Sequence, residues 1–172
     1  MVTGGRNVTT DTIVFTDLVG FTEYTDVCGD TAALAVLDQQ TTILSRALAS
    51  SGGRLVKELG DGLMLWFAHP TSALEVAVSM LAAVERARDQ RTFPLGLRVG
   101  MHSGDLLARG DDFVGQTVNI AARVVDLAGP AELLATDPVV AEVEAASFQP
   151  IGPTRVKGVA APVWLHRLQT IR

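Results

Sequence analysis

The sequence is poor in cysteine and in positive charge. Cys28 is the only cysteine among 172 residues, so an internal disulfide is impossible and a reducing compartment fits. We interpret this cysteine as a small packing residue rather than a nucleophile. The net charge is −5 and the pI is near 5.1, which argues against a nucleic-acid-binding protein that works through a basic surface. An anionic substrate is still compatible, because bound cations can override the net charge locally.

Long apolar runs are also missing. No uncharged apolar stretch approaches the roughly 18 residues of a membrane span, and the start, MVTGGRNVTT, has no apolar signal core. We therefore expect a soluble, cytoplasmic chain without a membrane segment.

The sequence contains no GxxxxGK[ST] segment, which excludes a P-loop NTPase.

The apolar content is sufficient for one folded domain. Hydrophobic residues make up 48% of the chain and charged residues 19%, which is typical of a globular protein. A chain of this length can bury a substantial core. We expect a single domain over residues 1–172.

The first half of the chain alternates strand and helix patterns. Residues 8–18 are predicted to be a strand, and residues 54–59 and 63–68 form two short strands around a Gly-Asp-Gly turn. Between them, residues 31–50 are predicted to form a helix whose apolar face holds Leu34, Leu37, Leu44, Ala47 and Leu48.

The second half repeats the alternation. A helix is predicted to start at Pro70 and Ser72, and its buried stripe is formed by Ala73, Ala77, Met80, Leu81 and Val84. The runs LGLRVGMHS and DLLARG follow, and then an amphipathic helix that begins near Gly115. The remaining residues predict weaker strands, a short helix near Val139 to Glu144 and a final strand at PVWLHRL.

This order predicts an α+β fold. Strand, helix, two strands, helix and strand make the ferredoxin-like βαββαβ arrangement, here with appended C-terminal strands and a helix. We expect a mostly antiparallel sheet with helices on one face. Function has to be inferred from the site, because this fold hosts many activities.

Two carboxylates stand beside glycines at the ends of apolar strands. Asp17 lies in FTDLVGFT and Asp61 in KELGDG. Taken alone, Asp61 is explained by a tight turn, and Asp17 by a strand end that caps the following turn. Together, two such acids make a divalent cation the natural partner. Oxygen ligands suit Mg²⁺ or Mn²⁺, whereas zinc would need Cys or His, and neither loop has the acids of an EF-hand.

Asn119 and Arg123 are four residues apart on the helix after Gly115, so they share a face. They flank its apolar stripe. One interpretation is a solvated helix edge. The other is an amide and a guanidinium fork aimed at a phosphate or a sugar, and spacing alone does not choose between them.

Four segments in order, FTDLVGFT, KELGDG, DDFVGQTVNIAAR and RVKG, together resemble the class III nucleotidyl cyclases, which make cyclic AMP or cyclic GMP. The resemblance covers about Arg6 to Leu168, so we expect the chain to be a bare catalytic domain. The acidic composition is most similar to actinobacterial, mycobacterial-type adenylyl cyclases.

The resemblance implies roles for individual residues. Asp17 and Asp61 match the acids that hold two metal ions, Mg²⁺ or Mn²⁺, and the Leu18 carbonyl joins them. Asn119 matches the residue that orients the ribose, and Arg123 the one that stabilises the transition state. The remaining positions match groups that bind the nucleotide: Lys57 and Asp112 at the purine, Lys157 at the terminal phosphates, and the amides of Gly20, Phe21 and Thr22 at the triphosphate.

Some positions depart from the family pattern. Asp111 stands where an aromatic residue is frequent, and Asp105 stands where some members carry a basic phosphate contact.

Lys157, considered alone, is an ordinary surface lysine. The three histidines, His69, His102 and His166, are interpreted as loop or strand residues rather than bases.

The implied reaction is attack of the ribose 3′ oxygen on the α-phosphate with loss of pyrophosphate, catalysed with two metal ions. Adenine offers an acceptor at N1 and a donor at its amino group, which match Lys57 and Asp112. Guanine offers the opposite polarity. We therefore predict ATP as the substrate and two equivalent sites at a homodimer interface, as in the family. The alternatives are a guanylyl cyclase and a non-catalytic nucleotide-binding regulatory module.

Overall fold

The computed structural model describes residues 11–171. The first predicted strand was expected from residue 8, and its residues 8–10 lie outside this range. The helices are α1 (Phe21–Cys28), α2 (Asp30–Leu48), α3 (Pro70–Asp89), α4 (Gln116–Leu127) and α5 (Asp137–Val140). The strands are β1 (Thr12–Val19), β2 (Arg54–Leu59), β3 (Gly62–Phe67), β4 (Gly96–Ser103), β5 (Leu107–Arg109), β6 (Asp112–Val114), β7 (Leu133–Thr136), β8 (Ala146–Thr154) and β9 (Val163–Ile171).

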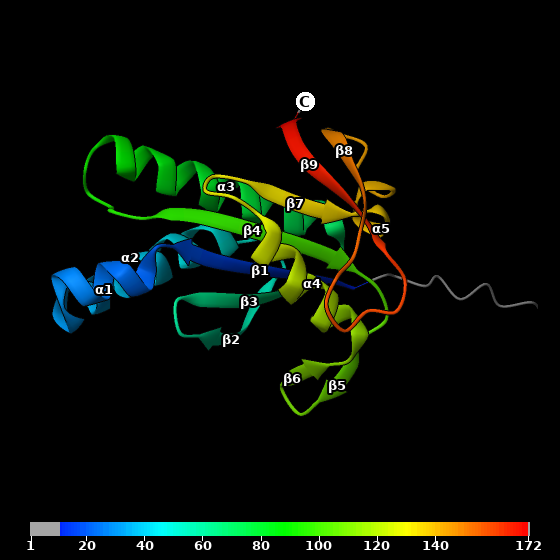
Figure 1. Ribbon diagram of the computed structural model, residues 1–172, viewed down its shortest axis with the longest axis horizontal. Helices are drawn as coiled ribbons and strands as arrows, with labels where there is room; N and C mark the ends of the chain where they lie inside the picture. Colours follow the sequence, from blue (N-terminus) through cyan, green and yellow to red (C-terminus); the bar gives the residue numbers. More distant parts are fainter. Residues whose placement is uncertain (1–10, 172) are drawn as a thin grey trace, which may run out of the picture.

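Seven strands form one sheet in the order β2-β3-β1-β4-β7-β9-β8, and β5 and β6 form a separate hairpin (Figure 1). The first four strands of the large sheet, β2-β3-β1-β4, have the order of a ferredoxin-like core, which confirms the predicted arrangement. Every pairing in the large sheet is antiparallel except β4 with β7. The predicted, mostly antiparallel α+β sheet is therefore confirmed.

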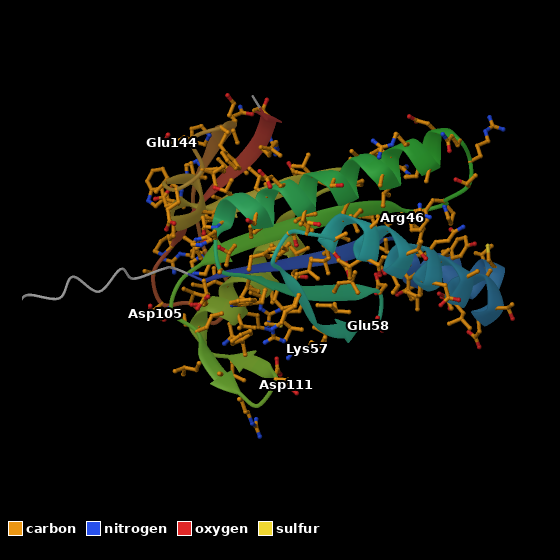
Figure 2. All side chains as sticks on the ribbon, turned by 180° about the vertical axis from the view of Figure 1, so that it is seen from behind. Arg46, Lys57, Glu58, Asp105, Asp111 and Glu144 are labelled. Atoms are coloured by element: carbon orange, nitrogen blue, oxygen red, sulfur yellow. The ribbon has the colours of Figure 1, made fainter. Side chains whose placement is uncertain are left out.

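The two faces of the sheet carry different helices. Alternate residues of a strand point to opposite faces, so Val14 and Leu18 pack with α2 and α3, whereas Ile13 and Phe15 pack with α4. Figure 2 shows α2 and α3 over one face, and in Figure 1 α4 lies on the other. The expectation of helices on a single face is correct for α2 and α3 but wrong for α4, which belongs to the appended part.

Helix α2 is rotated relative to the predicted apolar face. Its buried residues are Ala33, Val36, Gln40 and Leu44. Leu34 was predicted to be buried but is 59% exposed, because the face that meets the core passes through Ala33 and Val36, one residue before Leu34 and Leu37. The buried stripe of α3 agrees with the prediction at Ala73, Ala77, Met80 and Val84, and Leu81 is partly buried.

Helix α1 was not predicted. It follows directly on Gly20, whose φ of 81° is accessible mainly to glycine. None of its residues is buried, so it lacks the apolar periodicity on which a sequence-based assignment depends. Cys28, its last residue, is exposed, and the interpretation as a packing residue is wrong. The short C-terminal helix is α5, which begins before the predicted Val139.

Helix α4 lies unusually close to β4. A Cβ atom on Gly100 would stand 2.3 Å from the backbone nitrogen of Val125, a distance that real Cβ atoms do not reach. The two backbones are thus in direct contact, without an intervening side chain.

Within residues 11–171, no helix is both long enough and apolar enough to cross a bilayer.

His102 on β4 predicts a pH dependence of stability. Its Nδ1 lies 2.7 Å from the hydroxyl of Thr136, and burial lowers its pKa from 6.5 to about 4. Because the unfolded chain protonates first on acidification, stability is lost as the pH falls from 6.5 towards 4. Between pH 7 and pH 5 this loss should be about 2 kcal/mol for wild type.

The variant His102→Gln lacks this titration. Urea unfolding at both pH values measures the difference, and the variant should lose about 2 kcal/mol less than wild type over that interval. An equal loss in both proteins would contradict a neutral buried imidazole.

Candidate active site

The two predicted metal acids lie together at one end of the sheet. Asp17 is near the end of β1, and Asp61 is in the turn between β2 and β3. Because β1 pairs with β3, this turn lies beside the end of β1. The carboxylate of Asp61 accepts a hydrogen bond from the Leu18 N–H at 3.2 Å. The main-chain carbonyl of Asp61 accepts one from the buried Gln40 side chain at 3.0 Å.

The charge state of Asp61 reflects this arrangement. Burial raises the pKa of Asp61 above its ordinary value, and the neighbouring charge of Asp17 raises it further. Two converging carboxylate groups of this kind would be stabilised by a hard divalent cation, so the donor set fits Mg²⁺ or Mn²⁺. Within the described residues there is no group of three or more His, Cys, Asp or Glu side chains suited to a metal. Further ligands would have to come from the main chain or the substrate.

Arg98 is a site residue that the sequence analysis missed. It pairs with Asp17 across β1 and β4, and its Nη2 and Nε donate to the Asp17 Oδ2 at 2.6 and 2.9 Å. A third donor, Nη1, reaches the carbonyl of Asp126 in α4 at 3.2 Å. The signal was present, because an arginine inside the apolar run LGLRVGMHS is as anomalous as Asp17 in its own strand.

The segment after Asp17 has more regular structure than a loop. β1 continues to Val19, and α1 begins at Phe21. The amides of Phe21 and Thr22 therefore belong to the first turn of a helix, where N–H groups lack a helical partner. Such a helix start favours an anionic ligand, which agrees in chemistry with the predicted triphosphate role of Gly20, Phe21 and Thr22.

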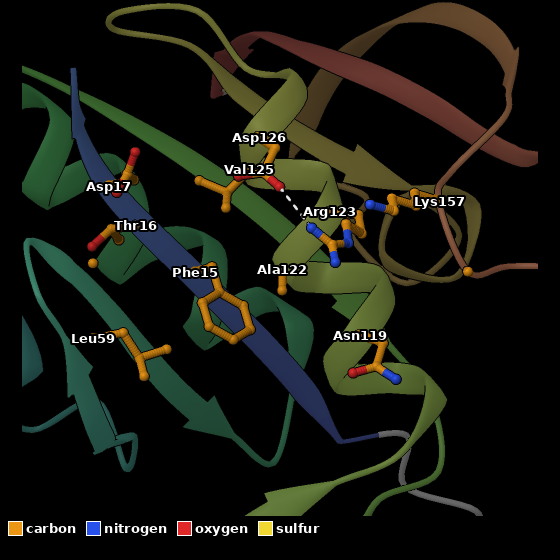
Figure 3. A pocket seen from close by; sticks show the side chains of 12 residues that line it. Phe15, Thr16, Asp17, Leu59, Asn119, Ala122, Arg123, Val125, Asp126 and Lys157 are labelled. Carbon is orange, nitrogen blue, oxygen red and sulfur yellow. Dashed lines mark hydrogen bonds and ion pairs between the residues drawn. The ribbon is translucent and has the colours of Figure 1, made fainter. Parts of the chain in front are cut away.

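A cavity of about 420 Å³ lies on the α4 face, between β1 and α4. Asp17 lies on one wall of the cavity, and Asn119, Arg123 and Lys157 lie on the other (Figure 3). The remaining lining residues are Phe15, Thr16, Leu59, Gly62, Ala122, Val125, Asp126 and Gly158. Four of the predicted site residues, from three distant parts of the sequence, thus meet around one space.

The arginine in this cavity is weakly held. The Arg123 side chain is 48% exposed, and its Nη1 lies 3.4 Å from the Asp126 carboxylate. A bond of that length between exposed groups contributes little. The guanidinium can therefore turn towards an anionic ligand at small cost.

Lys57 and Asp112 lie outside the lining of this cavity. Lys57 of β2 pairs with Met64, which belongs to the cluster under α4, so Lys57 is on the same face of the sheet as Asp17. Its Nζ donates to the Asp112 Oδ2 at 2.7 Å. This bond, and then the Phe113 N–H, lower the pKa of Asp112. The structure brings the predicted base-reading pair together, but not into the cavity of Asp17.

The histidines are placed as expected. His69 precedes α3, His102 is in β4 and His166 is in β9. None of them lines the cavity.

Comparison with known proteins agrees with the geometry. Residues 6–169 match the family described as adenylate and guanylate cyclase catalytic domain. The pH-sensitive adenylate cyclase of Mycobacterium tuberculosis is 31% identical over 96% of this chain and 41% of its own length. An adenylate cyclase of Streptomyces coelicolor is 35% identical over 74% of this chain and 32% of its own length. The chain thus spans less than half of these curated relatives.

Solved structures show the same fold. The adenylyl cyclase CyaB of P. aeruginosa has a TM-score of 0.85 at 22% identity, with 95% of each chain covered. The guanylate cyclase domain from Catenaria anguillulae in complex with GTP has a TM-score of 0.84 at 18% identity, covering 95% of this chain and 97% of that one. Cyclases of both nucleotide types are represented, so the fold does not identify the base.

Proposed function

The chain belongs to the family of adenylate and guanylate cyclase catalytic domains, and from this we propose that it is an adenylyl cyclase that converts ATP to 3′,5′-cyclic AMP and pyrophosphate. The observation that carries the choice of ATP is the contact between Lys57 and Asp112. In this pair the ammonium has N–H groups left for adenine N1, and the carboxylate has lone pairs left for the amino group.

The metal part of the proposal concerns Asp17, Asp61 and the Leu18 carbonyl, which would hold two Mg²⁺ or Mn²⁺ ions. When bound, these ions would lower the pKa of the ribose 3′-hydroxyl and neutralise phosphate charge. The proximity of the two carboxylates and the raised pKa of Asp61 support this assignment.

The remaining residues would position the nucleotide. Arg123 would meet the charge that develops at the α-phosphate, an interaction that is stronger in the transition state than in the ground state. Asn119 would orient the ribose and Lys157 the terminal phosphates, while the amides of Gly20 to Thr22 would bind the triphosphate. Asn119, Arg123 and Lys157 lie together on one wall of the cavity, which supports their action on one nucleotide.

We further propose that the site is completed by two copies of the chain. The base-reading pair does not line the cavity of its own chain, which supports a site assembled across an interface. Two-fold symmetry would then give two equivalent sites per homodimer. A cytoplasmic location, where ATP is available, is part of the same proposal.

The direct test is product formation with Mn²⁺ and either ATP or GTP. Cyclic AMP from ATP, with a much smaller yield of cyclic GMP from GTP, is expected. A preference for GTP would indicate a guanylyl cyclase instead, and nucleotide binding without product would indicate a regulatory module.

Base selection gives a sharper prediction. Replacing Lys57 with Glu and Asp112 with Cys reverses or removes the hydrogen-bond polarity of the pair. The ratio of kcat/KM values for ATP and GTP should fall by about 100-fold or more, because mispaired polar groups in a closed site are costly. If the double variant keeps the wild-type ratio, these residues do not read the base.

A further inference from the structure

The hairpin that carries Asp112 has little packing of its own. β5 and β6 form a two-stranded sheet apart from the large one, and all three residues of β5 are exposed. An isolated two-stranded hairpin is at best marginally stable in water. The position of Asp112 therefore depends on whatever holds this hairpin against the rest of the domain.

One arginine contacts both sides of that junction. The rings of Trp66 in β3 and Phe113 in β6 are stacked at 6.0 Å between centroids, with 24° between their planes. The guanidinium of Arg54 in β2 lies 5.7 Å from the Trp66 centroid and 5.0 Å from the Phe113 centroid. Such distances are in the range of favourable cation–π contacts. We call these three residues the Arg54 clamp.

The same guanidinium also binds the hairpin backbone. Arg54 Nη1 donates to the carbonyl of Asp111 at 3.1 Å. Asp111 and Phe113 are the two neighbours of Asp112, so the clamp holds the residue on each side of it. Lys57 lies three residues after Arg54 in β2, and Figure 2 shows it beside the hairpin that carries Asp111.

We propose that Arg54 is a positioning residue for selection of the nucleotide base. It would act through Asp112 by fixing the hairpin relative to Lys57, without touching the base. This inference rests on the proposed function, in which Lys57 and Asp112 read adenine. Hydrogen bonds weaken steeply with misalignment, so a loosened hairpin should lose discrimination while the phosphate chemistry continues.

The test compares two substitutions of Arg54. Arg54→Met removes the charge and the planar group, and the ATP-to-GTP ratio of kcat/KM should fall by about tenfold, the equivalent of one hydrogen bond. Arg54→Lys keeps the charge but not the fork, and its ratio should also fall. A wild-type ratio in Arg54→Lys would show that charge alone suffices and would overturn the clamp. The matched control is Arg46→Met, on α2 and away from the hairpin in Figure 2, which should keep the wild-type ratio.

Two further measurements separate this inference from the proposed function. Adding Arg54→Met to the Asp112→Ala variant should not change its ATP-to-GTP ratio of kcat/KM further, because Arg54 acts through Asp112. An unchanged ratio in Asp112→Ala alone would contradict base reading itself. If the ratio falls in Asp112→Ala but stays at the wild-type value in Arg54→Met, only the clamp is contradicted.

Docking of the hairpin can be followed without turnover. The chain has two tryptophans, so Trp164→Phe leaves Trp66 as the single reporter. Its emission should change in Arg54→Met, and constant emission would contradict the clamp. If Arg54→Met does not fold, Phe113→Leu removes a ring from the clamp and should give the same loss of base selection; an unchanged ratio there overturns the proposal.

Discussion

Alanine at either Asp17 or Asp61 is expected to abolish cyclisation of ATP, with a loss of about 1,000-fold or more. Each substitution removes an anionic ligand from the proposed cation site, and the two carboxylates lie together at one end of the sheet. Turnover measured with saturating Mn²⁺ is the readout. Near-normal activity in Asp17→Ala, with an intact circular dichroism spectrum, would refute the metal assignment.

Asparagine variants separate chemistry from folding. Asp17→Asn keeps an oxygen for Arg98, and Asp61→Asn keeps one for the Leu18 N–H. The metal-free Asp61→Asn protein should be at least as stable as wild type at neutral pH, because burial and the charge of Asp17 disfavour the ionised Asp61. Its activity should still be lost.

Cation binding can be measured independently of turnover. A ligand that binds only the folded state stabilises it by about 2.7 kcal/mol when its concentration is 100 times Kd. Wild type should therefore unfold at a higher temperature in Mn²⁺, and both asparagine variants should lose most of that shift. An equal shift in all three proteins would place the cation elsewhere.

Mixing two inactive variants, Asp17→Ala and Arg123→Ala, is expected to restore activity. If the acids come from one copy and the arginine from the other, a mixed dimer has one site with both lesions and one with neither. Random exchange makes half the dimers mixed, so activity should reach about a quarter of wild type. Cyclic AMP formation after demonstrated subunit exchange is the measurement.

The structure makes this experiment decisive, because Asp17 and Arg123 line one cavity within a single chain. If each site were built within one chain, every mixture would stay inactive. The matched control is Asp17→Ala mixed with Asp61→Ala. Both lesions then affect the acid side of a site, so no intact site forms and activity should not return.

The fold could be predicted wherever periodicity was strong. The hairpin around Asp61 and the buried stripe of α3 follow from residue order alone. Helix α1 could not be predicted, since none of its side chains is buried. Helix α4 lies on the other face of the sheet, where its backbone contacts that of β4 at Gly100, a long-range contact that no local pattern encodes.

Candidate site residues could be named from the sequence, but their contacts could not. Asp17, Asp61 and Arg123 were singled out from short segments. In the structure Asp61 accepts a hydrogen bond from the end of β1, and Arg123 lines a cavity with Asp17. The pairing of Arg98 with Asp17 depends on strand register, because they are 81 residues apart. The stacking of Arg54 on Trp66 and Phe113 likewise joins residues of β2, β3 and β6, which become neighbours only when the chain folds.

The contact between Gly100 and the backbone of Val125 also bears on how this domain can change over time. Side chains elsewhere in the core can be exchanged for others of similar size, and the elements around them shift slightly. Where two main chains touch, no side chain can absorb such a shift. The spacing between β4 and α4, the helix that carries Arg123, is therefore set by the main chain rather than by side-chain size. The core can diverge in sequence while this helix keeps its distance from the sheet.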